Sequence, residues 1–243
     1  FQQVFGFLLL TGIFNYVNSE LPPSIKICSP SDTECIKVAI ENSLLILQKD
    51  PSLLHVASIQ PIEVDKWVVP AGGIIVLFEQ VYTNIKCYNF GFSTVESVQS
   101  QIQNTSLIFS INIYNPQIEF KADYEFKNTT FVKIPTISKG KVSHKLSNYK
   151  AQINITGDII GQGDEKYVSV TSVKINLDIS GYISKFQTGN FFLDTITNKV
   201  FNTNWQLIFW EMKPALHQMF EHAFQKVMSP VFLAFPYSEL FLD

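Results

Sequence analysis

The sequence contains no arginine, so all 18 of its basic residues are lysines, and these are scattered along the 243-residue chain. Charged residues make up only 16% of the sequence, and the formal net charge is −3. Proteins that bind nucleic acids neutralise phosphates with clustered basic side chains. Because no such cluster is present, the sequence argues against a nucleic-acid partner.

The sequence also lacks motifs that carry catalysis. Gly91-Phe92-Ser93 has no second glycine of a nucleophile turn, and Gly161-Gln162-Gly163 has no third glycine of a dinucleotide-binding loop. His217 and His222 would lie about 140° apart around a helix, which does not suit joint metal ligation. His217 and Glu221 share a helical face and are expected to form a solvated polar pair. We therefore predict that the protein is not an enzyme and has no cofactor and no metal site.

Cysteine is scarce, with three residues in the chain. Cys28 and Cys35 lie close together, and in an oxidising compartment we expect them to form a disulfide. Closing so short a loop would contribute about 2–3 kcal/mol in the chain-entropy model. Cys87 stands apart and is expected to be buried and inert, with a reactive or intermolecular thiol as the alternative.

No run reaches the roughly 18 apolar residues that a membrane span needs. Residues 1–19 are instead typical of a secretory signal peptide. Val4–Phe14 forms its apolar core, and Val17-Asn18-Ser19 places small or compact residues at the cleavage offsets. A short membrane anchor is the weaker alternative. We predict a signal peptide over residues 1–19, a single domain over residues 20–243, secretion to the extracellular space, and no stable membrane insertion.

Three acceptor triplets for N-glycosylation fit a secreted protein, although single triplets are common by chance. They begin at Asn104, Asn128 and Asn154. All three lie in or beside expected strands, so these side chains should point outward if they carry glycans.

Aromatic and aliphatic residues are plentiful: hydrophobic content is 46%, with 21 Phe and 9 Tyr. Such a chain can build a sizeable core or an internal cavity. The most regular apolar pattern runs from Asn204 to about Ser229 and predicts a helix of about 25 residues, or roughly 37 Å. Asn204 is the expected N-cap. Pro214 is expected either to kink this helix or to begin a second one.

A shorter helix is predicted near the N-terminus. Ser31 to Glu34 looks like a capping box, in which each side chain binds a free backbone N–H. The helix stops before Asp50-Pro51. Its apolar face carries Ile36, Ala39, Ile40, Leu44 and Leu47.

Between Ile74 and about Leu193 the apolar residues alternate with polar ones, which predicts strands. The clearest strand is Glu119–Lys127, and an earlier one contains Leu107 to Ile113. Asn115-Pro116 is expected to form a turn between them. Strict alternation favours an antiparallel sheet with one wet face. Strands this long should curl, and the long helix is the object around which they would curl. The space between could hold a dry pocket or a solid core.

These segments resemble the insect takeout / juvenile-hormone-binding protein family over essentially the whole mature length. The matching parts are the signal peptide, Cys28 and Cys35 around a helix start, the connector from Asp50-Pro51 to Val64-Asp65, the segment Phe201-Asn202-Thr203-Asn204-Trp205 with Pro214 beyond it, and the terminal segment from Phe235 to Phe241. The single N-terminal cysteine pair resembles the takeout branch.

The resemblance implies an α+β fold in which a strongly curved antiparallel β-sheet wraps around one long C-terminal α-helix and encloses an elongated hydrophobic tunnel. It also implies a secreted carrier of small hydrophobic ligands, such as fatty-acid-like, isoprenoid or juvenile-hormone-like molecules.

We therefore predict a carrier that sequesters an apolar ligand inside the sheet, with no other cofactor. Tyr124 could also donate a hydrogen bond to a ligand head group. A secreted protein-interaction module without a ligand and a hydrolase of apolar esters are the alternatives. The expected ligand-binding residues are Trp205, Phe209, Met212, Leu216 and Phe220 from the helix, and Phe109, Ile111, Tyr124 and Phe126 from the sheet.

Overall fold

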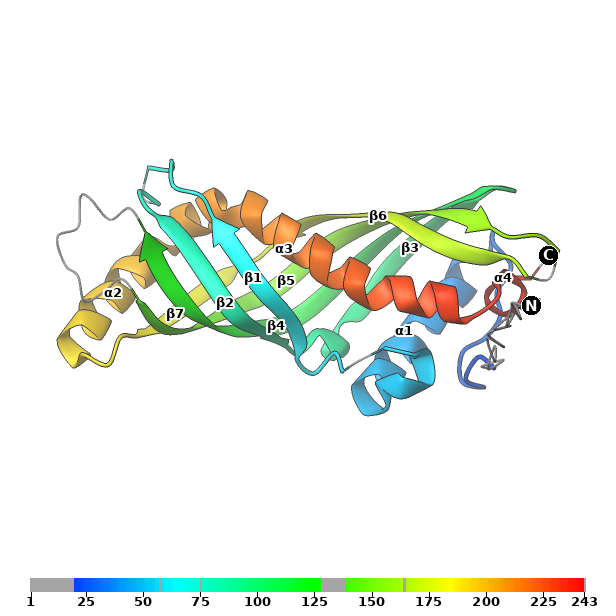
Figure 1. Ribbon diagram of the computed structural model, residues 1–243, viewed down its shortest axis with the longest axis horizontal. Helices are drawn as coiled ribbons and strands as arrows, with labels where there is room; N and C mark the ends of the chain where they lie inside the picture. The colour runs from blue at the N-terminus through cyan, green and yellow to red at the C-terminus, as the bar shows by residue number, and fades with distance from the viewer. Residues whose placement is uncertain (1–19, 57, 75, 128–138, 164, 243) are drawn as a thin grey trace, which may run out of the picture.

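A computed structural model describes residues 20–56, 58–74, 76–127, 139–163 and 165–242. Over these residues the chain forms a long curled sheet beside a 30-residue helix (Figure 1). The strands are β1 (Ile62–Val69), β2 (Glu79–Tyr88), β3 (Thr94–Ile102), β4 (Ser106–Lys127), β5 (Lys139–Ile160), β6 (Tyr167–Asp178) and β7 (Gly181–Gln187). The helices are α1 (Thr33–Lys49), α2 (Phe191–Thr203), α3 (Trp205–Ala234) and α4 (Tyr237–Leu240), with 3₁₀ turns η1 (Pro51–Leu54) and η2 (Phe90–Phe92).

The strands of the described residues belong to one antiparallel sheet with the order β1-β2-β4-β5-β6. β3 lies beside the first half of β4, and β7 beside the first half of β5. The two central strands have 22 residues each, and a sheet of such long strands twists into a half-barrel. α3 lies along the inner face of this half-barrel (Figure 1). The predicted curved antiparallel sheet around a long C-terminal helix is thus confirmed.

β4 is continuous through Asn115 and Pro116, so the predicted turn at this point is wrong. Pairing of β4 with β3 ends at Tyr114, and pairing with β2 begins at Glu119. Pro116 therefore lies where β4 changes neighbours on one side, and it is not among the residues paired with β5 on the other, so the strand can accommodate a residue without an N–H here. Pro116 and Gln117 are both exposed, which shifts the buried side chains from odd to even positions. The change of phase reflects an irregularity within one strand.

α3 is also continuous. It passes through the exposed Pro214 and extends to Ala234, so the alternative of two helices divided at Pro214 is wrong. The hydrogen bonds and packing on either side of Pro214 keep the two halves in one helix. The sequence predicted this helix from its start to about Ser229, five residues short of its end, but it did not predict α2, which directly precedes it.

Two helix caps differ from those predicted. Asn204 occupies the N-cap position of α3, but its Nδ2 donates to the Val200 carbonyl of α2 at 2.8 Å. Because α2 ends where α3 begins, the Asn204 side chain caps the C-terminal end of α2 rather than the N-terminal end of α3. At α1 the N-cap is Asp32 rather than Ser31, and its Oδ1 accepts a bond from the Cys35 backbone N–H at 3.0 Å.

His217 and Glu221 do not form the predicted solvated pair. The Leu177 backbone N–H donates to His217 Nε2 at 3.3 Å, and the Ile175 N–H donates to Glu221 Oε1 at 3.2 Å. Both donors belong to β6, an edge strand whose outer backbone groups need partners. These two side chains therefore attach α3 to one edge of the half-barrel. At the opposite edge, Trp67 Nε1 of β1 donates to the Ala215 carbonyl at 2.8 Å.

The edge of β7 is attached to α2 by two asparagines. Asn198 Oδ1 accepts from the Phe186 N–H at 2.6 Å, and its Nδ2 donates to the Phe186 carbonyl at 3.1 Å. Asn202 makes the same pair of bonds with Ser184, at 2.7 and 2.9 Å. Each carboxamide thus takes the place of a peptide group in a neighbouring strand.

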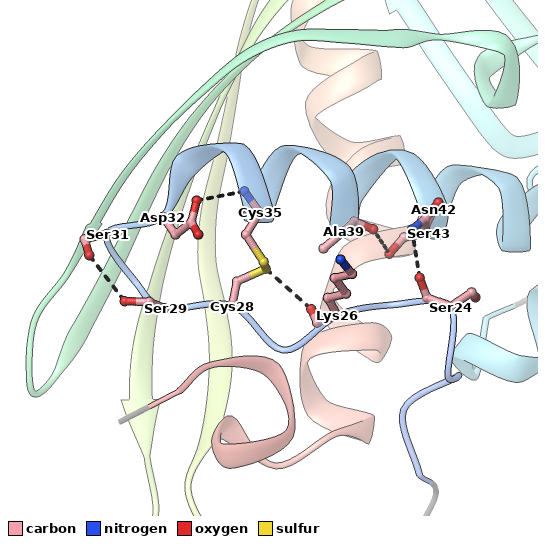
Figure 2. The surroundings of a disulfide bond; sticks show 10 residues. All are labelled: Ser24, Lys26, Cys28, Ser29, Ser31, Asp32, Cys35, Ala39, Asn42 and Ser43. Atoms are coloured by element: carbon pink, nitrogen blue, oxygen red, sulfur yellow. Dashed lines mark hydrogen bonds between the residues drawn. A yellow bond between two sulfur atoms is a disulfide. The ribbon is translucent and has the colours of Figure 1, made fainter.

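The cysteines are arranged as the sequence predicted. Cys28 and Cys35 form a disulfide that joins the N-terminal segment to α1 (Figure 2). Cys87 is free and fully buried, and burial raises the pKa of its thiol to about 12. A thiol with so high a pKa stays protonated, which makes it a poor nucleophile. Among the residues described, no helix combines the length and the apolar character needed to cross a membrane.

Candidate functional site

A cavity of about 210 Å³ is lined by residues of α1, α3, β4, β5 and the two ends of the described chain. Figure 1 shows α1 and α4 toward the same end of the molecule. Apart from Lys26, Ser43 and Ser93, every side chain that lines it is apolar. Cavities with few polar groups stay dry and favour apolar ligands. This cavity is the candidate functional site.

One wall of the cavity is the apolar face of α1. The disulfide holds the first turn of the helix, and Asp32 caps it. The helical periodicity predicts one apolar face with Ile36, Ala39, Ile40, Leu44 and Leu47, but it does not indicate that this face lines a cavity, and it does not include Ser43. The lining residues of α1 are Ile36, Ala39, Ile40, Ser43, Leu44 and Leu47.

The C-terminal half of α3 and the inner face of the sheet form the facing walls. Helical spacing directs one stripe of α3 toward the cavity, and strand alternation does the same for β4 and β5. The lining residues from these elements are Phe224, Val227, Met228, Val231 and Phe232 of α3, Phe109, Ile111 and Ile113 of β4, and Ile153 and Ile155 of β5.

Two of the nine residues predicted to bind ligand, Phe109 and Ile111, line this cavity. The other seven are not among its lining residues. Phe209, Met212 and Leu216 are buried between α3 and the sheet, and Trp205 is only half-buried. The alternation and the helical spacing predict that these side chains point inward. They do not show which inward side chains pack against each other in the core and which line a cavity.

Phe220 lies directly behind the cavity wall. Its ring is 5.5 Å from that of Phe90 and 5.8 Å from that of Tyr149, and Phe90 is 5.2 Å from Phe224. Phe90 and Phe224 line the cavity, whereas Phe220 and Tyr149 do not. We call these four residues the aromatic partition, because their ring contacts lead from the cavity wall into the core behind it.

Beyond the aromatic partition, the interior at the α2 end is packed with rings. Tyr124 lies 4.7 Å from Phe126 and 5.0 Å from Phe186, and Phe126 stacks on Phe201 at 6.2 Å. The Tyr124 hydroxyl is buried and has no hydrogen-bond partner among the described residues. Burial, followed by the charge of Asp194, raises the pKa of Tyr124 to about 12, so its hydroxyl is neutral.

His144 lies fully buried in this aromatic region. Its Nδ1 is 2.8 Å from Ser184 Oγ and 2.5 Å from the Tyr182 hydroxyl. A serine beside a histidine could act as a nucleophile and base. Both side chains are inaccessible, however, and neither lines the cavity. The pair therefore has no route to a substrate, and its role is structural.

The burial of His144 predicts a pH-dependent stability. Burial lowers its pKa to about 3, whereas an unfolded histidine has a pKa of about 6.5. The unfolded state therefore binds a proton that the folded state does not, and stability falls as the pH drops below about 6.5. Between pH 7 and pH 5 we expect His144 to lower the free energy of unfolding by about 2 kcal/mol.

Urea unfolding at both pH values would measure this effect by comparing the wild type with His144→Phe. The variant should lose about 2 kcal/mol less stability than the wild type over this interval, because its side chain cannot bind a proton. Replacing the exposed His222 by Phe is the control and should leave the pH dependence unchanged. Equal pH dependence in the wild type and His144→Phe would contradict the prediction.

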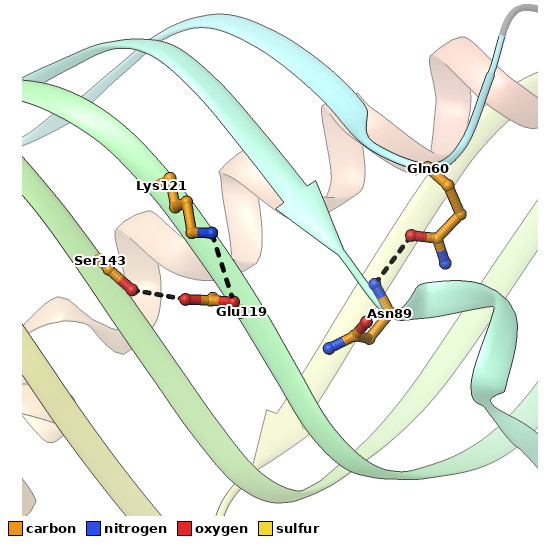
Figure 3. Close-up of polar contacts among 5 residues, drawn as sticks. All are labelled: Gln60, Asn89, Glu119, Lys121 and Ser143. Atoms are coloured by element: carbon orange, nitrogen blue, oxygen red, sulfur yellow. Dashed lines mark hydrogen bonds and ion pairs between the residues drawn. The ribbon is translucent and has the colours of Figure 1, made fainter.

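A second hollow lies on the outer face of the sheet, and most of the residues that line it are polar or charged. Glu119 contacts two of its neighbours there: Ser143 Oγ donates to its carboxylate at 2.7 Å, and Lys121 lies 3.8 Å away (Figure 3). Among the described residues, no group of three His, Cys, Asp or Glu side chains could hold a metal ion. The hollow is surrounded by charged side chains. Its lysines are Lys86, Lys121, Lys141, Lys145 and Lys185.

Comparison with known protein families shows the family to which the chain is related. The family model of the Haemolymph juvenile hormone binding protein (JHBP) matches residues 6–242. The chain belongs to this family. JHBP and takeout proteins are non-enzymatic and bind hydrophobic ligands, which agrees with the lack of catalytic motifs.

Individual relatives of this JHBP-family protein are distant in sequence but similar over their full length. It is 23% identical over 252 residues to the circadian clock-controlled protein daywake of Drosophila melanogaster, covering 97% of this chain and 96% of daywake. The daywake protein of Drosophila yakuba is 23% identical over 251 residues, covering 96% and 95%. The crystal structure of Epiphyas postvittana Takeout 1 superimposes with a TM-score of 0.73 at 13% identity, covering 90% of this chain and 100% of Takeout 1. The fold is therefore shared with Takeout 1.

Proposed function

We propose that this protein is a secreted carrier that holds a small hydrophobic ligand in the cavity between α1, the sheet and the C-terminal half of α3. The observation that carries the proposal is the apolar wall of a cavity of about 210 Å³ in a member of a ligand-binding family. Removing a hydrocarbon chain from water stabilises the complex by about 0.8 kcal/mol for each buried CH₂. After the costs of association, micromolar to nanomolar affinity is expected.

The geometry supports a fatty-acid-like or isoprenoid ligand confined to the α1 end. The cavity is smaller than the roughly 300–1,000 Å³ typical of sites for drug-sized ligands. It ends at Phe90 and Phe224 of the aromatic partition, so an elongated tunnel would require this cluster to rearrange. We therefore assign the ligand contacts to the α1 face, the C-terminal stripe of α3, and Phe109 and Ile111.

Secretion is part of the proposal. The predicted signal peptide and Asn128 lie outside the described residues. Asn104 is exposed between β3 and β4, and Asn154 is half-buried on β5, so Asn104 is the more accessible glycosylation site. The Cys28–Cys35 disulfide fits an oxidising compartment, and the family is named for haemolymph, an extracellular fluid.

The proposed function can be tested on protein secreted from a eukaryotic host. Native mass spectrometry followed by organic extraction should detect a bound apolar molecule, or the empty protein should take up a fatty acid or isoprenoid from a panel. An empty protein that takes up no member of the panel would contradict the carrier and favour an interaction module. Labelling by a covalent serine probe would instead favour the hydrolase.

A further inference from the structure

Lys26 is the one charged residue among the side chains that line the cavity. It is also exposed, so the cavity reaches the protein surface beside it. A ligand that fills the cavity would therefore meet an ammonium group at this rim and hydrocarbon elsewhere.

The backbone around Lys26 is fixed on both sides. Two residues before it, the Ser24 carbonyl accepts a bond from Asn42 Nδ2 of α1 at 2.7 Å (Figure 2). Two residues after it, Cys28 is joined to Cys35, and its carbonyl accepts the Leu242 N–H at 2.9 Å. Figure 2 shows the segment between these two attachments running alongside α1. The position of the Lys26 backbone relative to the rim is thus set by three separate links.

The Lys26 ammonium has no competing partner in the part of the chain that the structure describes. Over the residues that the structure describes, no carboxylate lies within ion-pair distance of it, in contrast to Lys86 and Lys174, which pair with Glu63 at 3.5 Å and Glu221 at 3.0 Å. The lysine charge at the rim is consequently available to a ligand.

We propose that Lys26 binds the carboxylate of an amphipathic ligand whose hydrocarbon chain fills the cavity, so that the preferred cargo is a fatty-acid anion rather than a neutral ester. A carboxylate is costly to bury in an apolar wall, whereas at the rim it stays hydrated and gains a charged hydrogen-bond donor. The inference rests on the proposed carrier function and adds the chemical class of the ligand to it.

The test compares dodecanoic acid with its methyl ester at neutral pH, by displacement of a fluorescent probe from the delipidated protein. The wild type should bind the acid more tightly than the ester. Lys26→Met should weaken binding of the acid by about three- to tenfold and leave the ester unchanged. Lys26→Arg should retain the preference, because it keeps the charge. Lys49→Met removes an exposed charge of α1 that does not line the cavity, and it should behave as the wild type.

The outcomes separate this inference from the carrier function. If the wild type binds both compounds and Lys26→Met changes the two affinities by the same factor, the carrier stands and the role of Lys26 is refuted. If Lys49→Met weakens binding of the acid as much as Lys26→Met does, the effect comes from the overall charge of the protein, and the assignment to Lys26 is again refuted. If the wild type binds neither compound nor any other apolar ligand, both proposals fail.

Discussion

Replacement of Ala39 by phenylalanine is expected to weaken binding of a hydrophobic ligand by at least about tenfold. Ala39 lies on the α1 face that lines the cavity, and a phenyl ring there would occupy space otherwise filled by ligand. Excluding two methylene groups from the cavity removes about 1.6 kcal/mol of burial, which corresponds to about a tenfold change in the dissociation constant. Titration of a fluorescent fatty acid would measure the loss.

The neighbouring residue supplies a matched control for this variant. Val38 is 43% exposed and does not line the cavity, so Val38→Phe adds a similar ring to the outer face of α1. It should bind the fatty acid as the wild type does. Thermal unfolding of both variants would show that each is folded. Equal binding of the fatty acid by Ala39→Phe and Val38→Phe would show that the ligand does not occupy the cavity beside α1.

The second large effect is expected at the aromatic partition. Phe220 has no exposed surface and contacts the rings of Phe90 and Tyr149. Truncating a buried phenylalanine to alanine removes its burial and leaves a hole, and typically costs about 3–5 kcal/mol. Phe220→Ala should therefore lower the free energy of unfolding by about this amount in a urea titration. The hole would adjoin the ligand cavity, so the variant should also gain affinity for longer hydrocarbon chains relative to shorter ones.

Phe192→Ala is the matched control, because Phe192 is 69% exposed and lies outside the cavity. Surface truncations of this kind usually change stability by less than about 0.5 kcal/mol. A loss below about 1 kcal/mol in Phe220→Ala would show that the partition repacks easily. An unchanged preference for chain length would show that the partition does not set the depth of the cavity.

The architecture could be predicted from the sequence to a large extent, because it depends on periodic patterns. Alternation in β4 and helical spacing in α3 each specify an inward face, and an amphipathic sheet with long strands must curl around something apolar. The prediction failed where a local signal competed with tertiary pairing. Asn115-Pro116 has the composition of a turn, yet β5 pairs with β4 on both sides of it and keeps the strand continuous.

The cavity itself was harder to predict. Trp205, Phe220 and Tyr124 are large aromatic residues on inward faces, and a sequence does not distinguish a ring that contacts a ligand from one that contacts another ring. That distinction depends on how side chains from distant elements fill space. Ile40 and Leu44 line the cavity, but in the sequence they read as an ordinary amphipathic stripe. Lys26 gave no signal at all, because its importance comes from its position at the rim.

The two asparagines of α2 have a consequence for the behaviour of the protein at high concentration. An uncovered strand edge offers a row of free backbone donors and acceptors to any other extended chain, which is a common start of aggregation. Asn198 and Asn202 already engage the donors and acceptors of Phe186 and Ser184 on β7, while His217 and Glu221 accept from two backbone N–H groups of β6. Edges closed in this way should give the protein colloidal stability whether or not a ligand occupies the cavity.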